Sequence, residues 1–346
     1  MMARVYGIDP GTSTLRIYQK GTGIIYNQKN MMAVIDGKKI IATGDAAWEM
    51  EGRTPANIEV VSPIRSGVLA QVKNMLAMLN IIFDQLGEEH GRMNGQEFIV
   101  ASPSYATEVE KKALVDLIAA CDIRPKRIRV VDSPLAAALG AGVNLRECFG
   151  TMVIDLGADT TEIAVLSLGG TVVSRMLKFG GNRLDESIIS AVRKYYNFAI
   201  GKKTAEQIKI KLGDAEHPEE ENTATMKVFG RDVVSGLPKS IAVDSLFVHL
   251  AIKEHLDKIA EVVFNMLEHI PPEMSADIME SGIYLTGGVS GIKNLDKVLS
   301  EMTGLKVFKC ENGSETVALG LGKIAEDPDY DFLAEKYSTL QVEDFR

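Results

Sequence analysis

The stretch TMVIDLGADTTEIAV, residues 151–165, carries the pattern from which the fold is predicted. An apolar, β-favouring run over residues 152–154 ends at the carboxylate of Asp155. Gly157 and a short polar run then turn the chain into a second apolar run over residues 163–165. Glycine accepts the left-handed backbone angles of tight turns, so Asp-x-Gly between two apolar runs is typical of a β-hairpin.

The same hairpin is a candidate site for a phosphate group and its metal ion. Successive backbone N–H groups in such a turn form an anion-binding concavity, here over Gly157, Ala158 and Asp159. Asp155 at the strand end could reach a hydrated Mg²⁺ that bridges carboxylate and phosphate oxygens. A single Asp-Gly hairpin is more often only a turn, so this stretch alone does not decide between the two interpretations.

A second copy of the pattern lies near the start of the chain. The strand-like run over residues 5–8 leads into Asp9-Pro10-Gly11-Thr12-Ser13-Thr14, and residues 15–18 form another such run. The repeat of Asp-x-Gly-x-x-Thr predicts two related halves whose hairpins face each other across a cleft that holds a polyphosphate. In this interpretation the first copy contributes Gly11, Thr12, Ser13 and Thr14 to phosphate binding, and Asp9 joins Asp155 at the metal.

Composition bounds the class of protein. The length of 346 residues suggests two domains, with one large domain or three small ones as alternatives. With 46% apolar and 25% charged residues the chain resembles an ordinary soluble globular protein. The net charge of −9 and the lack of a basic cluster argue against a nucleic-acid partner.

The three cysteines, Cys121, Cys148 and Cys310, lack CxxC spacing. They are interpreted as reduced thiols of a cytoplasmic protein, neither a disulfide framework nor a metal site. No apolar run approaches the ~18 residues of a membrane span.

Three further segments have a functional and a structural interpretation, both left open. Asp132 ends a strand-like run before a helix of small residues, so it is either a general base or a helix N-cap. Gly180-Gly181 begins a helix and suits either phosphate approach or capping. Gly287-Gly288-Val289-Ser290 follows a strand over residues 283–286, where glycines admit a flat ring or close helix packing.

Smaller features complete the expectations. Glu206 and Lys209 share a helix face and either bind a ribose or pair with each other. Capping boxes are predicted at Thr107 with Glu110 and at Thr204 with Gln207. Residues 21–41 are expected to form strands of one sheet, residues 214–222 a solvated acidic loop, and residues 327–346 a loosely held tail.

These residues together carry a family resemblance over essentially the full length. The chain resembles the actin-like ATPases, and within them the bacterial rod-shape-determining MreB and Mbl proteins. The two Asp-x-Gly segments resemble the phosphate loops and Thr286-Gly287-Gly288 the adenosine motif. Several further segments resemble MreB in particular: residues 52–55 (GRTP), 180–186 (GGNRLDE), 204–209 (TAEQIK) and 271–273 (PPE).

The resemblance implies an α/β actin-like fold, in which two ribonuclease-H-like domains flank a nucleotide cleft and each carries a smaller subdomain. The implied subdomains are IA (1–32, 66–145 and 315–346), IB (33–65), IIA (146–181 and 240–314) and IIB (182–239). It also implies binding of Mg²⁺ with ATP or ADP. The implied nucleotide ligands include Gly181, Glu206, Lys209, Gly287, Gly288 and Val289, and the implied catalytic residues are Asp132, Thr160 and Thr161.

The implied partner is a second copy of the chain, in a head-to-tail filament whose protofilaments pair, with residues 44–63 and 214–238 as contact regions. Membrane-associated shape or cell-wall proteins are further implied partners of a cytoplasmic protein.

The chain departs from the family pattern at three places. The usual glutamate before proline is Ser133, so whether ATP is hydrolysed is left open, and slow hydrolysis is expected. Asp159 replaces a usual glycine. No amphipathic helix precedes residue 5 and residues 87–95 lack an apolar pair, so no direct membrane anchor is expected. A sugar kinase of the same superfold and an ATP-binding regulator that does not polymerise are the alternatives.

Overall fold

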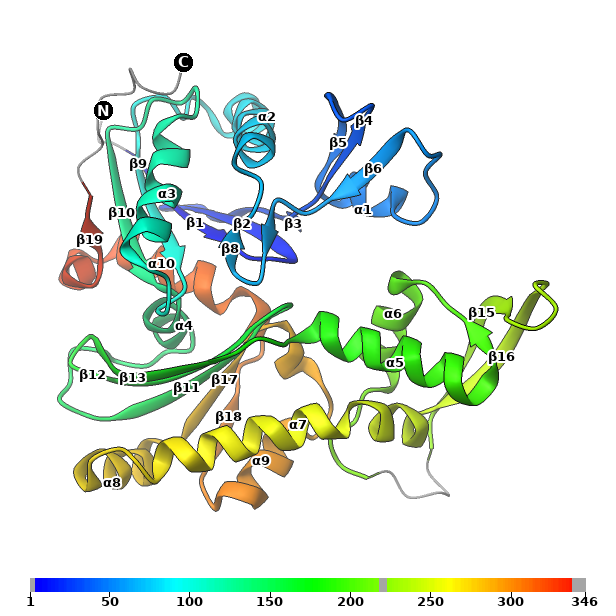
Figure 1. Cartoon of the computed structure of the whole chain (residues 1–346). Helices are drawn as coiled ribbons and strands as arrows, with labels where there is room; N and C mark the ends of the chain where they lie inside the picture. Colours follow the sequence, from blue (N-terminus) through cyan, green and yellow to red (C-terminus); the bar gives the residue numbers. More distant parts are fainter. Residues whose placement is uncertain (1–3, 218–222, 338–346) are drawn as a thin grey trace. The chain divides into compact units, whose positions relative to one another are not determined.

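The computed structural model describes residues 4–217 and 223–337. Its described residues fall into two compact units, coloured by sequence in Figure 1. The first unit takes in Met1–Cys148, Ala164–Ser174 and Glu315–Arg346, and the second takes in Phe149–Ile163 and Arg175–Ser314. The finer division into four subdomains stays a proposal.

The first unit is built on a sheet with the strand order β19-β10-β9-β1-β2-β3. Its strands are β1 (Val5–Pro10), β2 (Thr14–Gln19), β3 (Gly23–Lys29), β9 (Glu97–Ser102), β10 (Arg127–Asp132) and β19 (Glu335–Lys336). A smaller sheet contains β4 (Met32–Ile35), β5 (Lys39–Thr43) and β6 (Ile58–Val61), next to α1 (Gly44–Met50). A short ribbon pairs β7 (Ile64–Arg65) with β8 (Val68–Leu69). The helices are α2 (Val72–His90), α3 (Glu108–Ala119), α4 (Ser133–Gly140) and α10 (Thr316–Glu326), followed by a 3-10 helix over Pro328–Leu333.

Alternate residues of β1 pack in opposite directions. Tyr6 and Ile8 are buried in a core shared with α2 and α3, where Tyr6 stacks on Phe98 at 5.4 Å between ring centroids. Gly7, between them, faces Leu321 of α10, and a Cβ added at Gly7 would overlap the Cβ of Leu321. The sheet is therefore covered on both faces, as expected for parallel strands joined by helices.

Glycine allows α4 and α10 to pack backbone against backbone. A Cβ added at Gly320 would overlap the carbonyl oxygen of Ala136, and one at Gly140 would overlap that of Thr316. Because a side chain at either position would force the two helices apart, the small-residue composition of both helices is a packing requirement.

The second unit is built on a sheet with the order β13-β12-β11-β17-β18. Its strands are β11 (Thr151–Leu156), β12 (Thr161–Ser167), β13 (Gly170–Leu177), β17 (Ile283–Thr286) and β18 (Val307–Lys309). Ala164–Ser174, which includes parts of β12 and β13, groups with the first unit. A small sheet joins β14 (Phe198–Ala199), β15 (Thr225–Asp232) and β16 (Pro238–Asp244). The helices are α5 (Gly181–Tyr196), α6 (Lys202–Leu212), α7 (Ser245–Leu267), α8 (Pro272–Ser281) and α9 (Leu295–Thr303), with 3-10 turns at Gly288–Gly291 and Gly313–Glu315.

The strand order of the first sheet is repeated in the second. In the first unit β3, β2 and β1 lie side by side, and β1, β9 and β10 are parallel. In the second unit β13, β12 and β11 lie side by side, and β11, β17 and β18 are parallel. The duplication predicted from the two Asp-x-Gly segments is therefore confirmed at the level of topology.

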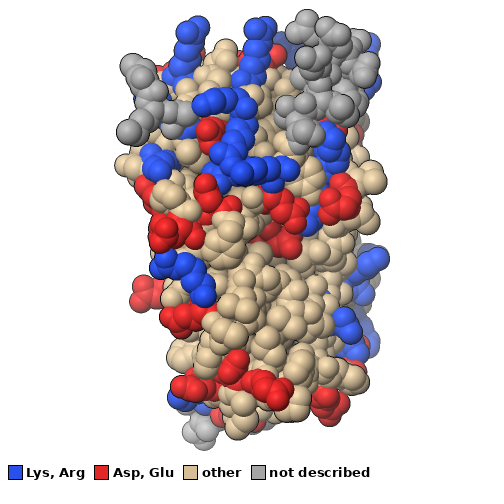
Figure 2. All heavy atoms as spheres, turned by 90° about the vertical axis from the view of Figure 1, so that its left-hand side faces the viewer, with Lys and Arg blue, Asp and Glu red and all other residues tan. Residues whose placement is uncertain are grey.

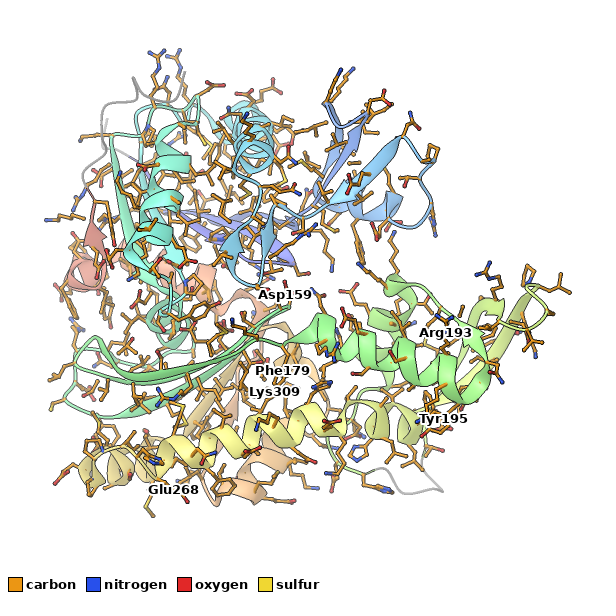
Figure 3. The ribbon with its side chains drawn as sticks, viewed as in Figure 1. Asp159, Phe179, Arg193, Tyr195, Glu268 and Lys309 are labelled. Atoms are coloured by element: carbon orange, nitrogen blue, oxygen red, sulfur yellow. The ribbon has the colours of Figure 1, made fainter. Side chains whose placement is uncertain are left out.

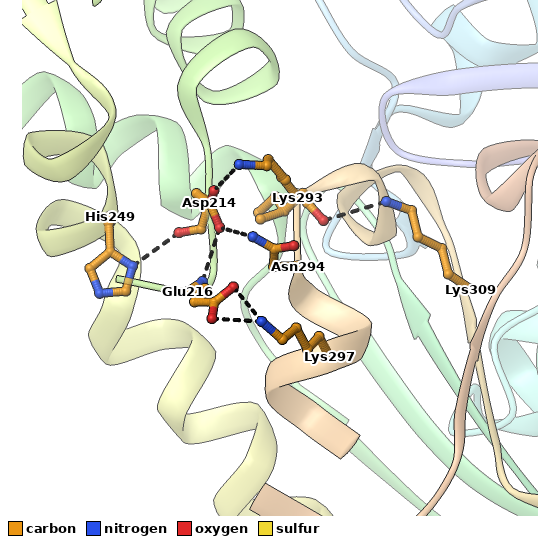
Figure 4. Close-up of polar contacts among 8 residues, drawn as sticks. Asp214, Glu216, His249, Lys293, Asn294, Lys297 and Lys309 are labelled. Atoms are coloured by element: carbon orange, nitrogen blue, oxygen red, sulfur yellow. Dashed lines mark hydrogen bonds and ion pairs between the residues drawn. The ribbon is translucent and has the colours of Figure 1, made fainter. Parts of the chain in front are cut away.

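The expectation of a solvated acidic loop after α6 is wrong at its first residue. Asp214 is buried, and its carboxylate accepts hydrogen bonds from Lys293 Nζ and Asn294 Nδ2, each at 2.9 Å (Figure 4). Its backbone oxygen lies 3.0 Å from His249 Nδ1 on α7. The carboxylate thus ties the chain after α6 to the loop before α9. Residues 218–222 lie outside the described part of the chain.

Three other local expectations differ from the structure. Residues 21–41 belong to two sheets, because β3 joins the large sheet and β4 and β5 the small one. The capping box at Thr107 is confirmed, but α6 begins at Lys202 and Thr204 is already inside it. Residues 328–336 are held in place, since β19 pairs with β10 and Asp331 binds Arg129; residues 338–346 lie outside the description.

Charge of both signs is present on the surface. On the face shown in Figure 2, Lys and Arg side chains lie beside Asp and Glu side chains, with uncharged surface between them.

None of the helices in the described part of the chain has the length and apolar character needed to span a membrane.

The α4–α10 contact predicts that a methyl group added at the glycine between the helices lowers the free energy of unfolding. Gly320→Ala should destabilise the protein by about 1–3 kcal/mol, because the new Cβ overlaps a backbone oxygen that cannot turn away. Gly87→Ala, in α2 with no heavy atom near its Cβ position, should leave stability unchanged or raise it by up to about 1 kcal/mol. Urea unfolding measures both, and equal effects of the two changes would contradict this packing.

Candidate functional site

The β1–β2 turn of the first unit is held by the side chain of Asn30. Asn30 Nδ2 donates to the oxygen of Gly11 at 2.7 Å, and its backbone N–H donates to that of Ser13 at 2.9 Å. A peptide C=O and the N–H that follows it point in opposite directions, so the N–H of Thr12 points away from Asn30. A Cβ at Gly11 would lie 2.8 Å from the oxygen of Thr14, so the turn closes only with glycine.

Asp9 is the second-last residue of β1 and lies directly opposite Arg16 of β2. Both side chains are nearly buried, with exposed fractions of 12% and 11%, and Arg16 Nη1 lies 3.5 Å from Asp9 Oδ2. Thr12 connects this turn to the β7–β8 ribbon, since the N–H of Gly67 donates to its hydroxyl at 3.3 Å. The predicted metal carboxylate therefore sits beside a cation that the sequence analysis did not single out.

Asp132 ends β10 and occupies the N-cap position of α4, but its side chain does not cap the helix. The carboxylate instead binds Lys111 Nζ of α3 at 2.9 Å. Burial acts to lower the pKa of Lys111, whereas the hydrogen bond and charge of Asp132 act to raise it. The carboxylates of Glu335 and Glu108 act in the same direction, so the pKa of Lys111 is raised. The interpretation of the Asp132 side chain as the N-cap of α4 is therefore excluded.

In the second unit the hairpin after Asp155 is clamped by the start of α5. The N–H of Gly181 donates to Gly157 O at 3.0 Å, and that of Asn182 donates to Ala158 O at 2.8 Å. A Cβ at Gly180 would overlap the oxygen of Gly157. This close approach accounts for glycine at position 180, while contact of Gly181 with a ligand stays a prediction.

The hairpin also closes on itself. The N–H of Gly157 donates to Thr160 O at 2.9 Å, and the hydroxyl of Thr161 donates to Phe179 O at 3.1 Å. Asp159 accepts from Asn182 Nδ2 at 2.7 Å; Figure 3 labels Asp159 and Phe179 where the hairpin meets α5. The unusual Asp159 is thus fixed by the first turn of α5.

Asp155 is oriented by the neighbouring strand. It lies opposite Thr286 in the β11–β17 register, and the Thr286 hydroxyl donates to Asp155 Oδ1 at 3.0 Å. The next residue, Gly287, has φ +81°, and a Cβ there would overlap the backbone of Leu156. The Gly-Gly after β17 therefore brings its turn directly against the end of β11.

Residues predicted for the ribose and base come together beside the same hairpin. Lys209 Nζ donates to Gly181 O and to Asp185 Oδ2, each at 2.9 Å. A Cβ at Gly181 would lie 3.0 Å from Lys209 Nζ and 3.1 Å from Val289 Cγ2. Gly181, Lys209 and Val289 thus share one small region of the second unit, although Lys209 is already bound to a carboxylate.

The donor set in each unit fits a phosphate group with a hydrated magnesium ion. Each unit offers a turn in which a Cβ would meet a backbone oxygen within about 3 Å, at Gly11 and at Gly157, with a carboxylate just before it. Within the described residues, no three His, Cys, Asp or Glu side chains are grouped to hold a metal ion. Magnesium usually keeps several waters and binds one or two carboxylates plus substrate phosphates, so Asp9 and Asp155 suit it without such a group.

Sequence reasoning missed three side chains at these sites: Arg16, Lys111 and Asp185. Lys111 could have been found, because it stands three residues before Leu114 and seven before Ile118 on the apolar face of α3. Arg16 stands between Leu15 and Ile17, where strand alternation allows a polar residue, so no local signal marked it. A charge on an apolar helix face was the available signal for Lys111.

A duplicated sheet of this order, with an Asp-x-Gly hairpin at the first strand of each copy, defines an actin-like protein. A family model described as MreB/Mbl protein matches residues 3–331. The chain belongs to the MreB/Mbl family, which confirms the resemblance and the actin-like fold predicted from the sequence.

Individual relatives cover nearly the whole chain. The cell shape-determining protein Mbl of Bacillus subtilis is 36% identical over 95% of this chain and 98% of its own. The cell shape-determining protein MreB of Escherichia coli is 37% identical over 94% of each. The crystal structure of MreB 5 of Spiroplasma citri bound to AMPPNP matches with a TM-score of 0.89 and 33% identity, over 96% of this chain and 98% of that one. Full-length relatives of this kind identify an actin-like cytoskeletal protein.

The Lys111–Asp132 ion pair predicts that replacing Lys111 destabilises the protein more than replacing the adjacent Lys112. Lys111→Met should lower the free energy of unfolding by about 1–3 kcal/mol, because it leaves a half-buried carboxylate without its partner. Lys112→Met, whose partner Asp116 is more exposed, should change it by no more than about 0.5 kcal/mol. Urea unfolding at pH 7 compares them, and equal losses would contradict the assignment.

The pH dependence of the pair follows from the raised pKa of Lys111. Its contribution is present at neutral pH and is lost only as pH rises through a value above the ordinary lysine pKa of about 10.4. The difference in free energy of unfolding between Lys111→Met and the unmodified chain, measured by urea unfolding, should therefore persist from pH 7 to pH 9.

Proposed function

We propose that this chain binds ATP and ADP with Mg²⁺ and assembles into filaments that help to organise cell shape. The observation that carries the proposal is the carboxylate-glycine hairpin repeated at the same strand position in both units. Family membership supports it, since the Spiroplasma citri relative was solved with AMPPNP and with ADP.

The residues have separate roles in this proposal. Backbone N–H groups of residues 11–14 and 157–159 bind phosphate oxygens, while Asp9 and Asp155 hold the waters of the magnesium ion. Gly181, Glu206 and Lys209 contact the ribose, and Gly287, Gly288 and Val289 border the base. Magnesium, when bound, neutralises phosphate charge; the chain itself orients the phosphates by fixed turns that need no rearrangement.

Hydrolysis is proposed to be slow. Ser133 begins α4 and carries no carboxylate. Asp132 is the remaining base candidate, with Thr160 and Thr161 in the other unit, and the ion pair with Lys111 keeps it oriented toward α3. Because Asp132 Oδ1 is already bound by Lys111 Nζ at 2.9 Å, positioning a water rather than taking its proton is the role proposed for Asp132.

Filament assembly is supported by apolar surface in one predicted contact region. On the β15–β16 hairpin, Phe229, Val234 and Leu237 have exposed fractions of 70%, 85% and 64%. Exposed apolar side chains gathered in one hairpin are typical of an interaction surface. The proposed partner is a second copy of the chain. Location in the cytoplasm, with any membrane attachment through a partner protein, is part of the same proposal.

Nucleotide binding should raise thermal stability. Saturating Mg-ATP stabilises a protein by mass action, by about 2.7 kcal/mol at a hundredfold excess over Kd. Asp155→Ala should remove most of this shift, whereas Asp257→Ala, an exposed carboxylate on α7, should keep it. Differential scanning fluorimetry is the measurement, and an unchanged melting temperature at millimolar Mg-ATP would refute the proposal.

Assembly should depend on nucleotide and on the β15–β16 hairpin. Ultracentrifugation with Mg-ATP, Mg-ADP or no nucleotide should pellet the chain in at least one state, with filaments visible by negative-stain microscopy. Val234→Glu should abolish pelleting, while Val109→Glu, equally exposed on α3, should not. Soluble monomer in all three states would instead identify an ATP-binding regulator that does not polymerise.

A further inference from the structure

Arg16 is a largely buried cation in the middle of a strand. Its neighbours Leu15 and Ile17 are fully buried, and the Arg16 side chain itself is only 11% exposed. Removing a guanidinium from water is costly unless hydrogen bonds and an opposite charge replace the lost hydration. The partners of Arg16 therefore indicate which opposite charge its guanidinium binds.

The protein satisfies Arg16 poorly. A guanidinium has five N–H donors, but within the described residues its one hydrogen bond joins Nη1 to Asp9 Oδ2 at 3.5 Å. Its Nε is buried and has no partner there. A well-formed arginine–carboxylate pair makes two bonds of about 2.7–2.9 Å. Arg16 is thus held near Asp9, while other N–H donors of its guanidinium form no hydrogen bond within the described residues.

The unused donors lie beside the candidate phosphate turn. Asp9, opposite Arg16, is the residue that leads into the turn over residues 11–14. A second cation lies at the turn, because Lys29 pairs with Thr14 in the β2–β3 register and its Nζ lies 3.4 Å from Ser13 Oγ, as well as 4.8 Å from the centroid of the Trp48 ring. Two positive side chains near one turn favour the binding of an anion.

We propose that Arg16 binds the phosphate chain of the nucleotide and takes over part of the charge neutralisation that a magnesium ion would otherwise supply. The inference rests on the proposed nucleotide function. A guanidinium suits it, since its planar fork matches two phosphate oxygens at once. Arg16 also lowers the attraction of Asp9 for a cation, because like charges this close repel strongly in a poorly hydrated site. Nucleotide affinity therefore depends only weakly on Mg²⁺.

The first test uses the unmodified chain. Fluorescent ADP and a fluorescent, non-hydrolysable ATP analogue are titrated in millimolar Mg²⁺ and again in EDTA, with anisotropy as the readout. Removal of Mg²⁺ should weaken binding by less than about tenfold, which corresponds to 1.4 kcal/mol. A loss of more than a hundredfold in EDTA would overturn the inference without any variant.

The second test compares Arg16→Met with Arg16→Lys and with Arg92→Met, which removes an exposed arginine of the same unit. Loss of a charge-assisted bond should weaken binding in EDTA by about tenfold to a hundredfold in Arg16→Met, and by less when Mg²⁺ is present. Arg16→Lys keeps the charge without the fork and should fall between. Arg92→Met should bind as the unmodified chain does.

The outcomes separate this inference from the proposed function. If the unmodified chain binds neither nucleotide in either buffer, both are overturned. If it binds and Arg16→Met shows the same ratio of affinities with and without Mg²⁺, only the role of Arg16 is overturned, and the residue is a structural partner of Asp9. Should Arg16→Met fail to fold by its melting curve, Arg16→Lys and the unmodified chain decide the result.

Discussion

The second unit depends on a contact between backbones that only glycine permits. Gly180 allows the first turn of α5 to donate its N–H groups to the carbonyl oxygens of the hairpin after Asp155. On the other side, Gly287 lets the turn after β17 lie against Leu156. The hairpin is thereby fixed from two directions, so the peptide groups that would meet a phosphate are ordered before any ligand arrives. Preorganisation of this kind reduces the entropy lost on binding.

Three predicted carboxylates, Asp9, Asp132 and Asp155, are each held by a donor from a neighbouring element. Arg16 lies beside Asp9, Lys111 binds Asp132, and Thr286 donates to Asp155. These donors differ in charge. The Thr286 hydroxyl that orients Asp155 is neutral, whereas the Lys111 ammonium beside Asp132 and the Arg16 guanidinium beside Asp9 are positive. The three carboxylates are therefore oriented by different kinds of donor.

The same two devices, glycine contacts and buried ion pairs, act outside the candidate site. Gly140 and Gly320 let α4 and α10 pack closely behind the sheet of the first unit. Asp214, buried among Lys293 and Asn294, ties the chain after α6 to the loop before α9. In both places the residue fixes the position of a helix through partners that are distant along the chain. The local sequence alone indicates only a loop residue or a small core residue.

The sequence by itself determined the duplicated hairpins, the actin-like fold and the helix boundaries that depend on local signals. Asp-x-Gly between apolar runs and the capping box at Thr107 act over a few residues, so their consequences can be read directly. Only the tertiary structure decided which partner each charged side chain takes. Asp132 binds a lysine on another helix instead of capping its own, and Asp214 is buried instead of solvated. Hydrogen bonds and ion pairs form between residues that the fold brings together, and their energies depend on burial, which no local pattern records.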